Sequence, residues 1–363
     1  MRRSLLLILL INAQSLSRAL VAQETRSRLS QALLSPSGKL TFSPEIFIPE
    51  PSDPTAILLQ TNAIQTLSER IRTCKANSVF IQGSLSALKT FTSEQESARG
   101  GFPGPVPVVY CGTGNSESND YDLEAVAESG PDGVLVRVCS GKEVGSLEDI
   151  ISDETWVKLY QEALDKGIQP IPEITVGLNV AASWGEEEVS GMVEKLTEVA
   201  DGEEPVCILL TVNAEENGDD DHEADNEAEE PATLPQVPKA LGKRIPILGS
   251  ICAQAGDNRL GGSSALLKDA GFTGALLRKE CLPGMRIQLD LGIVGQFWSA
   301  CINDLKSVKS KSFSFRSKNN MEKSAMTKWA NYQNSVIESG ALGDPEDSYS
   351  LVDEAAGEYK GFA

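Results

Sequence analysis

Short apolar runs alternate with amphipathic stretches along most of the chain from about residue 41. Eight of these runs are rich in β-branched and other apolar residues, which is typical of buried strands. They lie at 43–49, 78–84, 106–112, 132–139, 169–176, 206–212, 244–252 and 274–281. The stretches between them, such as 63–76, 155–167 and 186–201, have the apolar spacing of helices. Strands that are apolar throughout and alternate with helices indicate a parallel sheet that is covered on its faces.

Eight such units in about 250 residues predict an α/β fold whose strands close into a (β/α)8 barrel, the TIM barrel. An open, doubly wound sheet is the alternative, but no GxGxxG sequence follows the first strand to support it. We expect the barrel over residues 41–300, with an acidic loop insertion at 214–243 after the sixth strand. A C-terminal extension follows at 301–363.

Two segments lie outside the alternating pattern. The insertion has ten acidic residues within 215–230, together with the one histidine of the chain, His222. Like charges repel one another, so we expect a solvated, disordered loop; weak binding of a divalent cation is the alternative, although the EF-hand glycine and spacing are missing. The extension is first basic and then acidic, and its stretch 325–340 has helical character with Trp329 and Tyr332 on one side. That helix either packs on the barrel or binds a protein partner.

Residues 1–40 have the pattern of a targeting segment. Two arginines precede the apolar run 5–11, which is too short to span a bilayer, and small residues follow, as in a secretory signal. Residues 23–39 are rich in Ser and Arg, as transit peptides are. A signal followed by a transit-like segment predicts import into the stroma of a plastid (chloroplast), with secretion as the alternative. No later segment is apolar over about 18 residues, so we expect no membrane association after processing.

Composition excludes several classes of function. The chain has 52 acidic and 32 basic residues and a formal net charge of −20, which argues against a sequence-independent nucleic-acid-binding protein. A single histidine rules out histidine-based triads and multi-histidine metal sites. The seven cysteines are scattered and form no CxxC, which indicates buried free thiols rather than a disulfide framework or a zinc site. We expect neither a metal nor a cofactor.

In a barrel enzyme the chemistry lies at the carboxyl ends of the strands, and these ends carry a family likeness. Segment 44–54 has the sequence PEIFIPEPSDP, and segment 209–213 has the sequence LLTVN. They resemble the first strand, AEIKKASPSKG, and the sixth strand, GINNRDL, of the indole-3-glycerol-phosphate synthase family. The likeness continues through the third, fourth, fifth, seventh and eighth units, at 105–112, 125–138, 160–175, 245–250 and 268–282. It therefore covers about residues 41–285 in the right order and spacing.

The resemblance implies a carbon–carbon lyase of tryptophan biosynthesis, which closes an indole ring on a phosphorylated, ring-opened sugar with loss of carbon dioxide and water. It implies that Glu45 and Glu173 are the catalytic carboxylates. The substrate-binding positions that it implies are Ser52, Asn213, Ser250 and Arg278. Each position also has a structural interpretation, because a glutamate can hold loop backbone, Ser52 can belong to a turn and Asn213 can cap a loop. Charged residues at the end of the eighth strand, Arg278 and the neighbouring Lys279, suggest an anion site or a salt bridge to an acid.

The chain also departs from the family pattern where the chemistry needs lysine. Ring closure requires a proton donor that also pairs with the substrate carboxylate, which lysine supplies. The two lysine positions hold Phe47 and Cys111, the sixth-strand arginine position holds Glu215, and Arg278 replaces a glycine next to the sugar phosphate. No histidine is available to activate Cys111, so we expect a buried thiol there. Three hypotheses remain open: the family reaction, a relative acting on another sugar phosphate, and a barrel that has lost the chemistry and serves as a binding or assembly protein.

Overall fold

Eight parallel strands form a closed barrel in the order β1 to β8, which confirms the predicted (β/α)8 architecture. The computed structural model describes residues 23, 26, 28–35, 38–50, 56–113, 119, 121–213, 234–252, 259–282 and 290–307. The strands are β1 (Thr41–Ile48), β2 (Val79–Gly83), β3 (Val108–Tyr110), β4 (Gly133–Arg137), β5 (Gln169–Gly177), β6 (Ile208–Asn213), β7 (Ile247–Ile251) and β8 (Gly274–Leu277). Each strand is hydrogen-bonded to its sequence neighbour, and β8 closes the barrel on β1.

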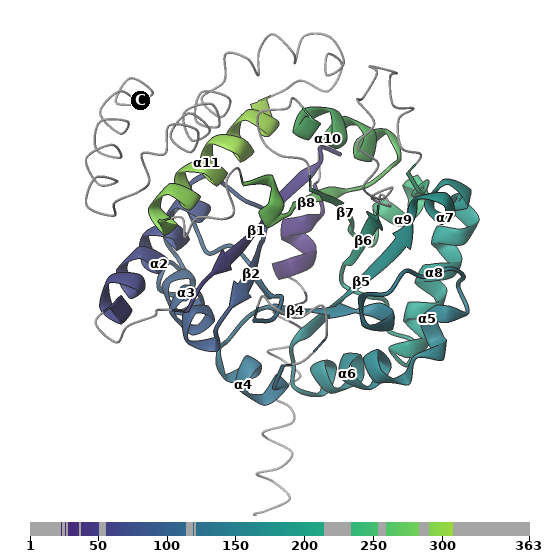
Figure 1. Ribbon diagram of the computed structural model, residues 1–363, viewed down its shortest axis with the longest axis horizontal. Helices are drawn as coiled ribbons and strands as arrows, with labels where there is room; N and C mark the ends of the chain where they lie inside the picture. Colours follow the sequence, from purple (N-terminus) through teal and green to yellow (C-terminus); the bar gives the residue numbers. More distant parts are fainter. Residues whose placement is uncertain are drawn as a thin grey trace, which may run out of the picture.

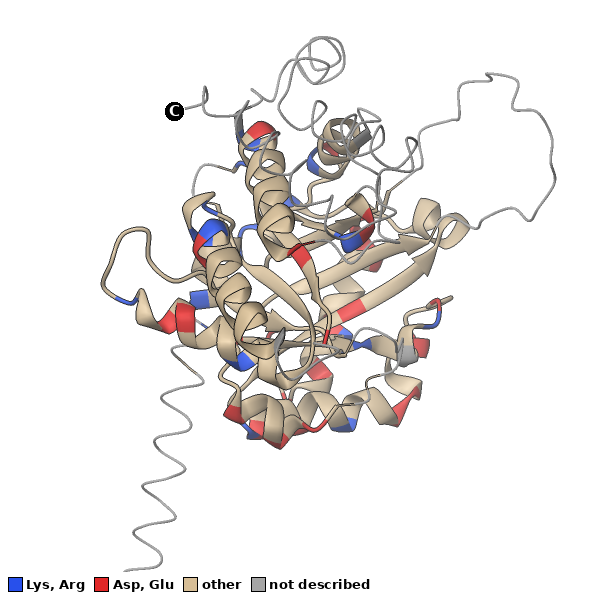
Figure 2. Cartoon of the chain, turned by 60° about the vertical axis from the view of Figure 1, so that its left-hand side comes forward, with Lys and Arg blue, Asp and Glu red and all other residues tan. Residues whose placement is uncertain are grey.

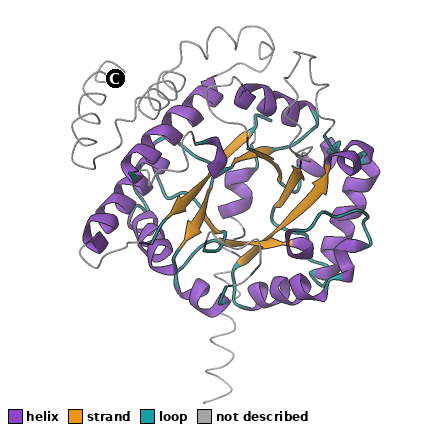
Figure 3. Cartoon of the chain, in the orientation of Figure 1, coloured by secondary structure: helices purple, strands orange, loops and turns teal. Residues whose placement is uncertain are grey.

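A ring of helices surrounds the ring of strands (Figures 1 and 3). The helices are α2 (Ala56–Thr73), α3 (Leu85–Ser97), α4 (Leu123–Glu128), α5 (Asp149–Ser152), α6 (Glu154–Asp165), α7 (Leu178–Ser183), α8 (Glu186–Val199), α9 (Lys239–Gly242), α10 (Arg259–Asp269) and α11 (Leu291–Ser307). The Asp122 and Asp153 carboxylates accept hydrogen bonds from first-turn amides, so these residues cap the starts of α4 and α6. Charged residues are spread over the outer helices, whereas the strands are mostly uncharged (Figure 2).

Two predicted strands end earlier than their apolar runs. The chain leaves β4 and β8 through the short 3-10 helices η1 (Val138–Gly141) and η2 (Lys279–Cys281). Val138 and Cys281 are fully buried in these turns. An apolar run therefore continues in the sequence after the ladder hydrogen bonds have stopped, and hydrophobic periodicity alone does not detect the turn.

The barrel interior has an apolar part and a polar part, and each contains side chains at more than one height, since Glu173 of β5 is in register with Leu209 of β6. The floor layer, near the amino ends of the strands, is apolar and contains Phe80, Val109, Leu135, Ile171, Leu209, Leu248 and Leu276. Two residues further along each strand, the same face carries a second set of side chains, because strand side chains alternate between faces. This mouth layer consists of Gln82, Cys111, Arg137, Glu173, Thr211, Ser250 and Arg278, together with Glu45 from β1.

A short helix at residues 28–33 closes the floor. It is the purple helix at the centre of the barrel in Figure 1, and its Leu29 and Leu33 are fully buried against the floor layer. Polar contacts fix the helix at the amino ends of the strands: Arg28 forms an ion pair with Asp132 at 3.0 Å, and Asn77 donates to the Ala32 carbonyl at 2.8 Å. Burial is the main cause of a raised pKa at Asp132, although Arg28 opposes it. The folded barrel therefore includes residues within the predicted 1–40 targeting segment, while the targeting function stays a prediction.

The other predicted boundaries are refined where the structure describes them. Residues 234–243, which we placed in the acidic insertion, contain α9 and the buried Val237 and Leu241. Helix α11 continues past the predicted boundary at residue 300 and packs beside α2. The acidic run at 215–230 and the extension from residue 308 lie outside the described residues. Among the helices that are described, none is long and apolar enough to cross a membrane.

Candidate functional site at the barrel mouth

The mouth layer is organised around Arg278, which leaves β8 with its side chain in the barrel. Its guanidinium forms an ion pair with Glu45 on β1 at 3.3 Å and a shorter one with Glu173 on β5. It also donates to the Thr211 hydroxyl at 3.0 Å, and that hydroxyl lies 3.2 Å from a carboxylate oxygen of Glu173. One side chain therefore joins strands from opposite sides of the barrel. The structure brings together Glu45, Glu173 and Arg278, which the resemblance had placed at the site.

A second arginine completes the charged network. Arg137, at the end of β4, lies with its Nε 3.4 Å from the other carboxylate oxygen of Glu173. Asn119 holds the Arg137 backbone through two hydrogen bonds of 2.8 Å, one to its carbonyl and one from its amide. The network of Glu45, Glu173, Arg137 and Arg278 contains two negative and two positive charges, so it has no net charge.

The network is deeply buried. Glu45 and Glu173 are 3% and 5% exposed, and Arg278 is 9% exposed. Burial alone would lower the pKa of Arg278, but the carboxylates of Glu173 and Glu45 outweigh burial and raise it. Replacing a buried ion network by apolar side chains is often neutral or stabilising, so stability alone does not explain these charges. Their place at the carboxyl ends of the strands is where barrel enzymes hold substrates.

Lys279 brings another cation to the mouth. Its ammonium donates a 2.6 Å hydrogen bond to the Gln82 side chain at the end of β2 and lies 5.7 Å from the centre of the Phe47 ring. Among the described residues, no carboxylate forms an ion pair with it. Phe47 is 39% exposed and stands where the resemblance expects a lysine. A lysine from the end of β8 therefore lies over Phe47 of β1, beside Gln82 of β2.

The remaining predicted site residues are not among the four residues of the charged network. Asn213 ends β6 and is exposed, and its amide donates to Glu143 in the loop after β4 at 3.3 Å, as a loop-holding residue would. Ser250 follows Leu248 by two residues on β7 and so faces the interior, next to the eighth strand. Ser52 lies outside the described residues.

Cys111 is fully enclosed in the mouth layer. Burial is the main cause that raises the pKa of its thiol well above the ordinary value, and Glu45 adds to the rise while Arg137 and Arg278 oppose it. A thiol that stays protonated is a poor nucleophile, which agrees with the expectation of a buried thiol. Among the described residues there is also no group of three or more His, Cys, Asp or Glu side chains that could hold a metal ion.

Several residues of the site were not singled out from the sequence. Arg137, Thr211 and Gln82 all follow an interior floor residue by two positions, so the strand alternation contains the signal that places them in the mouth. The resemblance does not include them, because it concerns only the family's own catalytic positions. The contact between Asn213 and Glu143 joins the end of β6 to the loop after β4, and no local pattern predicts it.

Comparisons with known proteins assign no family to the chain. No protein-family model matches the chain, and no curated protein matches it. Similar solved structures include Rhizobium etli pyruvate carboxylase T882A with acetyl coenzyme-A, at 9% identity over 86% of this chain and 32% of that chain, with a TM-score of 0.44. The chain thus spans about a third of the length of that protein. Another is N-acetylneuraminate lyase from Mycoplasma synoviae, at 11% identity over 83% of each chain, with a TM-score of 0.39. A third is a Schiff-base-forming fructose-1,6-bisphosphate aldolase, at 11% identity over 81% of this chain and 99% of that chain, with a TM-score of 0.38.

Two of these neighbours are an aldolase and a lyase by description. Likeness at this level of identity concerns the architecture, which the strand order already establishes. The family assignment to indole-3-glycerol-phosphate synthase stays a prediction.

Proposed function

We propose that the protein is a barrel enzyme of the carbon–carbon lyase type, related in layout to indole-3-glycerol-phosphate synthase, which acts on a small phosphorylated sugar derivative at the mouth. The observation that carries the proposal is the position of Lys279. Its ammonium lies over Phe47 and beside the Glu45–Arg278–Glu173 network, where a lysine of the family type is otherwise missing.

The chemistry divides between the two neighbouring cations. Arginine keeps its proton under all ordinary conditions, so Arg278 serves as an electrostatic partner of the carboxylates and of an incoming anion. Lysine can both pair with a substrate carboxylate and donate a proton, so Lys279 is the group that would protonate the departing oxygen as water is lost. In this scheme Glu45 and Glu173 hold Arg278 in place and move protons when a substrate anion competes for the arginine.

A test of this proposal uses the full chain and carboxyphenylamino-deoxyribulose phosphate, with indole fluorescence followed over hours. We expect product from the wild type, a loss of at least about 100-fold in Lys279→Gln, as removal of a general acid typically causes, and no change in Lys89→Gln. Lys89 is an exposed lysine of α3, so the control makes the same chemical change away from the mouth. Equal rates in the two variants would contradict the role of Lys279.

A second candidate function is a binding barrel without catalysis. The observation that favours it is the complete neutralisation of the mouth network, in which both carboxylates already have arginine partners. In that case the substrate raises the melting temperature of the chain through mass action, while no indole product forms. Thermal shift measured alongside the fluorescence assay separates the two functions.

A further inference from the structure

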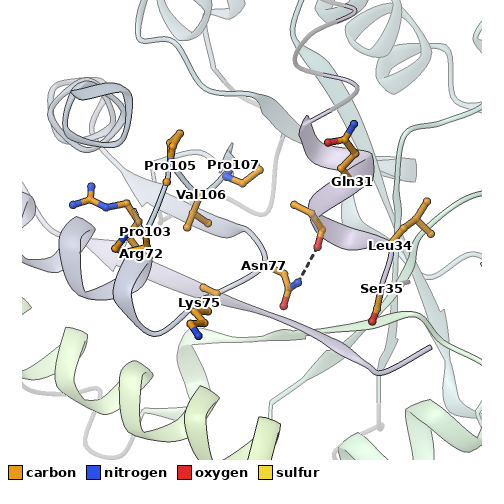
Figure 4. A pocket seen from close by; sticks show the side chains of 13 residues that line it. Gln31, Leu34, Ser35, Arg72, Lys75, Asn77, Pro103, Pro105, Val106 and Pro107 are labelled. Atoms are coloured by element: carbon orange, nitrogen blue, oxygen red, sulfur yellow. Dashed lines mark hydrogen bonds between the residues drawn. The ribbon is translucent and has the colours of Figure 1, made fainter. Parts of the chain in front are cut away.

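A cavity lies at the opposite end of the barrel from the mouth. It has a volume of about 420 Å³, which is within the usual range of about 300–1,000 Å³ for small-molecule sites. Its walls come from the floor helix and the residues after it, the end of α2 with the following turn, and the loop before β3 (Figure 4). The lining residues are Gln31, Ala32, Leu34, Ser35, Arg72, Lys75, Ala76, Asn77, Pro103, Gly104, Pro105, Val106 and Pro107.

One wall of the cavity is apolar and short of hydrogen-bond donors. Backbone N–H groups are missing at Pro103, Pro105 and Pro107. The Val106 amide donates a 2.8 Å hydrogen bond to the Gln95 side chain and is therefore not available to a ligand. That bond ties the loop to α3. Proline rings pack against flat aromatic rings wherever proline-rich peptides are recognised. This wall is therefore suited to a flat apolar ring.

Apart from Ala32, Leu34 and Ala76, the rest of the lining is polar, and its charged residues, Arg72 and Lys75, are both positive. Asn77 is held in place, because it donates to the Ala32 carbonyl at 2.8 Å and accepts from the Phe42 amide at 3.1 Å. Lys75 has a left-handed backbone with φ of 59°, and its carbonyl accepts a hydrogen bond from Lys306 of α11. The turn therefore presents an exposed lysine at the edge of the cavity.

The charge of the lining contrasts with that of the chain. The stem of Arg72 lines the cavity while its guanidinium points away, toward Glu94 of α3, with which it pairs at 2.5 Å (Figure 4). None of the described residues that line the cavity is acidic, although the chain has a net charge of −20. A site with a flat apolar wall and a cationic edge selects a ligand that is flat and negatively charged.

We propose that this floor cavity binds a small flat organic anion, with its ring against the proline loop and its charged group near Lys75. The ligand contacts the floor helix, α2 and the loop before β3 at once, so its binding stabilises the closed floor of the barrel. The site is independent of the mouth, and its ligand is recognised by other residues.

The test is a calorimetric titration of the full chain with 2-naphthoate, which is flat and carries one carboxylate. We expect saturable one-to-one binding, with weaker binding of the neutral 2-naphthamide and of acetate, which lacks the ring. Lys75→Gln removes the cation and Gln31→Glu adds an acid to the lining, and each should weaken naphthoate binding about threefold or more, as for a half-exposed charge contact. Lys89→Gln is the matched control and should bind as the wild type does.

Three results would overturn the proposal. The first is absence of saturable binding, and the second is equal binding of 2-naphthoate and 2-naphthamide. The third is an affinity that Lys75→Gln and Gln31→Glu leave unchanged while Lys279→Gln lowers it, since that would place the ligand at the mouth. Lys75 and Gln31 are both exposed, so we expect each variant to fold as the wild type does. Circular dichroism of each variant checks this.

Discussion

The two ends of the barrel interior use the same strands for opposite purposes. At the floor, Leu29 and Leu33 of the short helix fill an apolar layer, and burial of apolar surface stabilises the fold. At the mouth, two residues further along the strands, the layer is a network of two glutamates and two arginines. Charged groups lose their hydration on burial, so this layer contributes little net stability. The apolar floor layer therefore stabilises the barrel, whereas the polar mouth is the place for the proposed lyase chemistry, and the floor cavity is a separate binding site.

Truncation of the two floor leucines should have the largest effect on the free energy of unfolding. Leu29→Ala with Leu33→Ala removes two fully buried side chains, and each leucine truncation should cost about 2–5 kcal/mol of unfolding free energy. Urea denaturation measures the loss. The control is Leu58→Ala with Leu59→Ala in α2, whose side chains are 70% and 72% exposed. A floor variant as stable as this control would show that the helix does not belong to the folded core.

Removal of Arg278 tests the mouth network. Arg278→Met leaves Glu45 and Glu173 buried without their shared partner, and loss of one member of a buried pair typically costs about 3–5 kcal/mol. Adding Glu45→Gln removes the stranded charge of Glu45, while Glu173 keeps Arg137 at 3.4 Å, so the double variant should recover much of the loss. Recovery in urea denaturation supports a balanced network. A double variant less stable than Arg278→Met alone would mean that Glu45 has another partner.

Unfolding at alkaline pH tests one buried thiol at each end of the barrel interior. Burial raises the pKa of Cys207 near the floor, and burial together with Glu45 raises that of Cys111 at the mouth. Above about pH 9 the unfolded chain releases these protons while the folded chain retains them, so the unfolding free energy falls as pH rises. Cys207→Ala and Cys111→Ala should each make that fall less steep, by at most about 1.4 kcal/mol per pH unit. Urea denaturation at several pH values measures the slope, and a wild-type slope in either variant would mean that its thiol is accessible to solvent.

Lys279→Gln should have the smallest effect on stability. The side chain is only partly buried and has one hydrogen bond, so the change in unfolding free energy should stay within about 0.5 kcal/mol. Thermal denaturation next to Lys89→Gln measures it. A large loss would mean that Lys279 supports the fold, and its proposed role in ligand binding would then need separate proof.

Much of this fold was accessible from the sequence, and the reason is periodicity. Eight apolar runs separated by helical patterns specify eight buried strands, and all eight are observed. The helix at 28–33 was missed because its serine and arginine content resembles a transit peptide. Only tertiary contact with the floor layer shows that Leu29 and Leu33 are core residues.

The candidate site was only partly predictable. The resemblance placed Glu45, Glu173 and Arg278 at the mouth, and all three lie toward the carboxyl ends of their strands or just beyond. Their pairing through one guanidinium does not follow, since it depends on which side chains reach across the barrel. Lys279 could be placed at the mouth but not over Phe47, because the 3-10 turn after β8 sets its direction.

The most direct test of the central claim compares one variant from each end of the barrel. The affinity of the full chain for carboxyphenylamino-deoxyribulose phosphate is measured by calorimetry, well below the melting temperature of every variant. The account predicts that Lys279→Gln weakens binding about tenfold or more with an unchanged melting temperature, whereas Leu33→Ala lowers the melting temperature and leaves the affinity unchanged. Loss of affinity in Leu33→Ala with wild-type affinity in Lys279→Gln would contradict the division between a stabilising floor layer and a substrate-binding mouth.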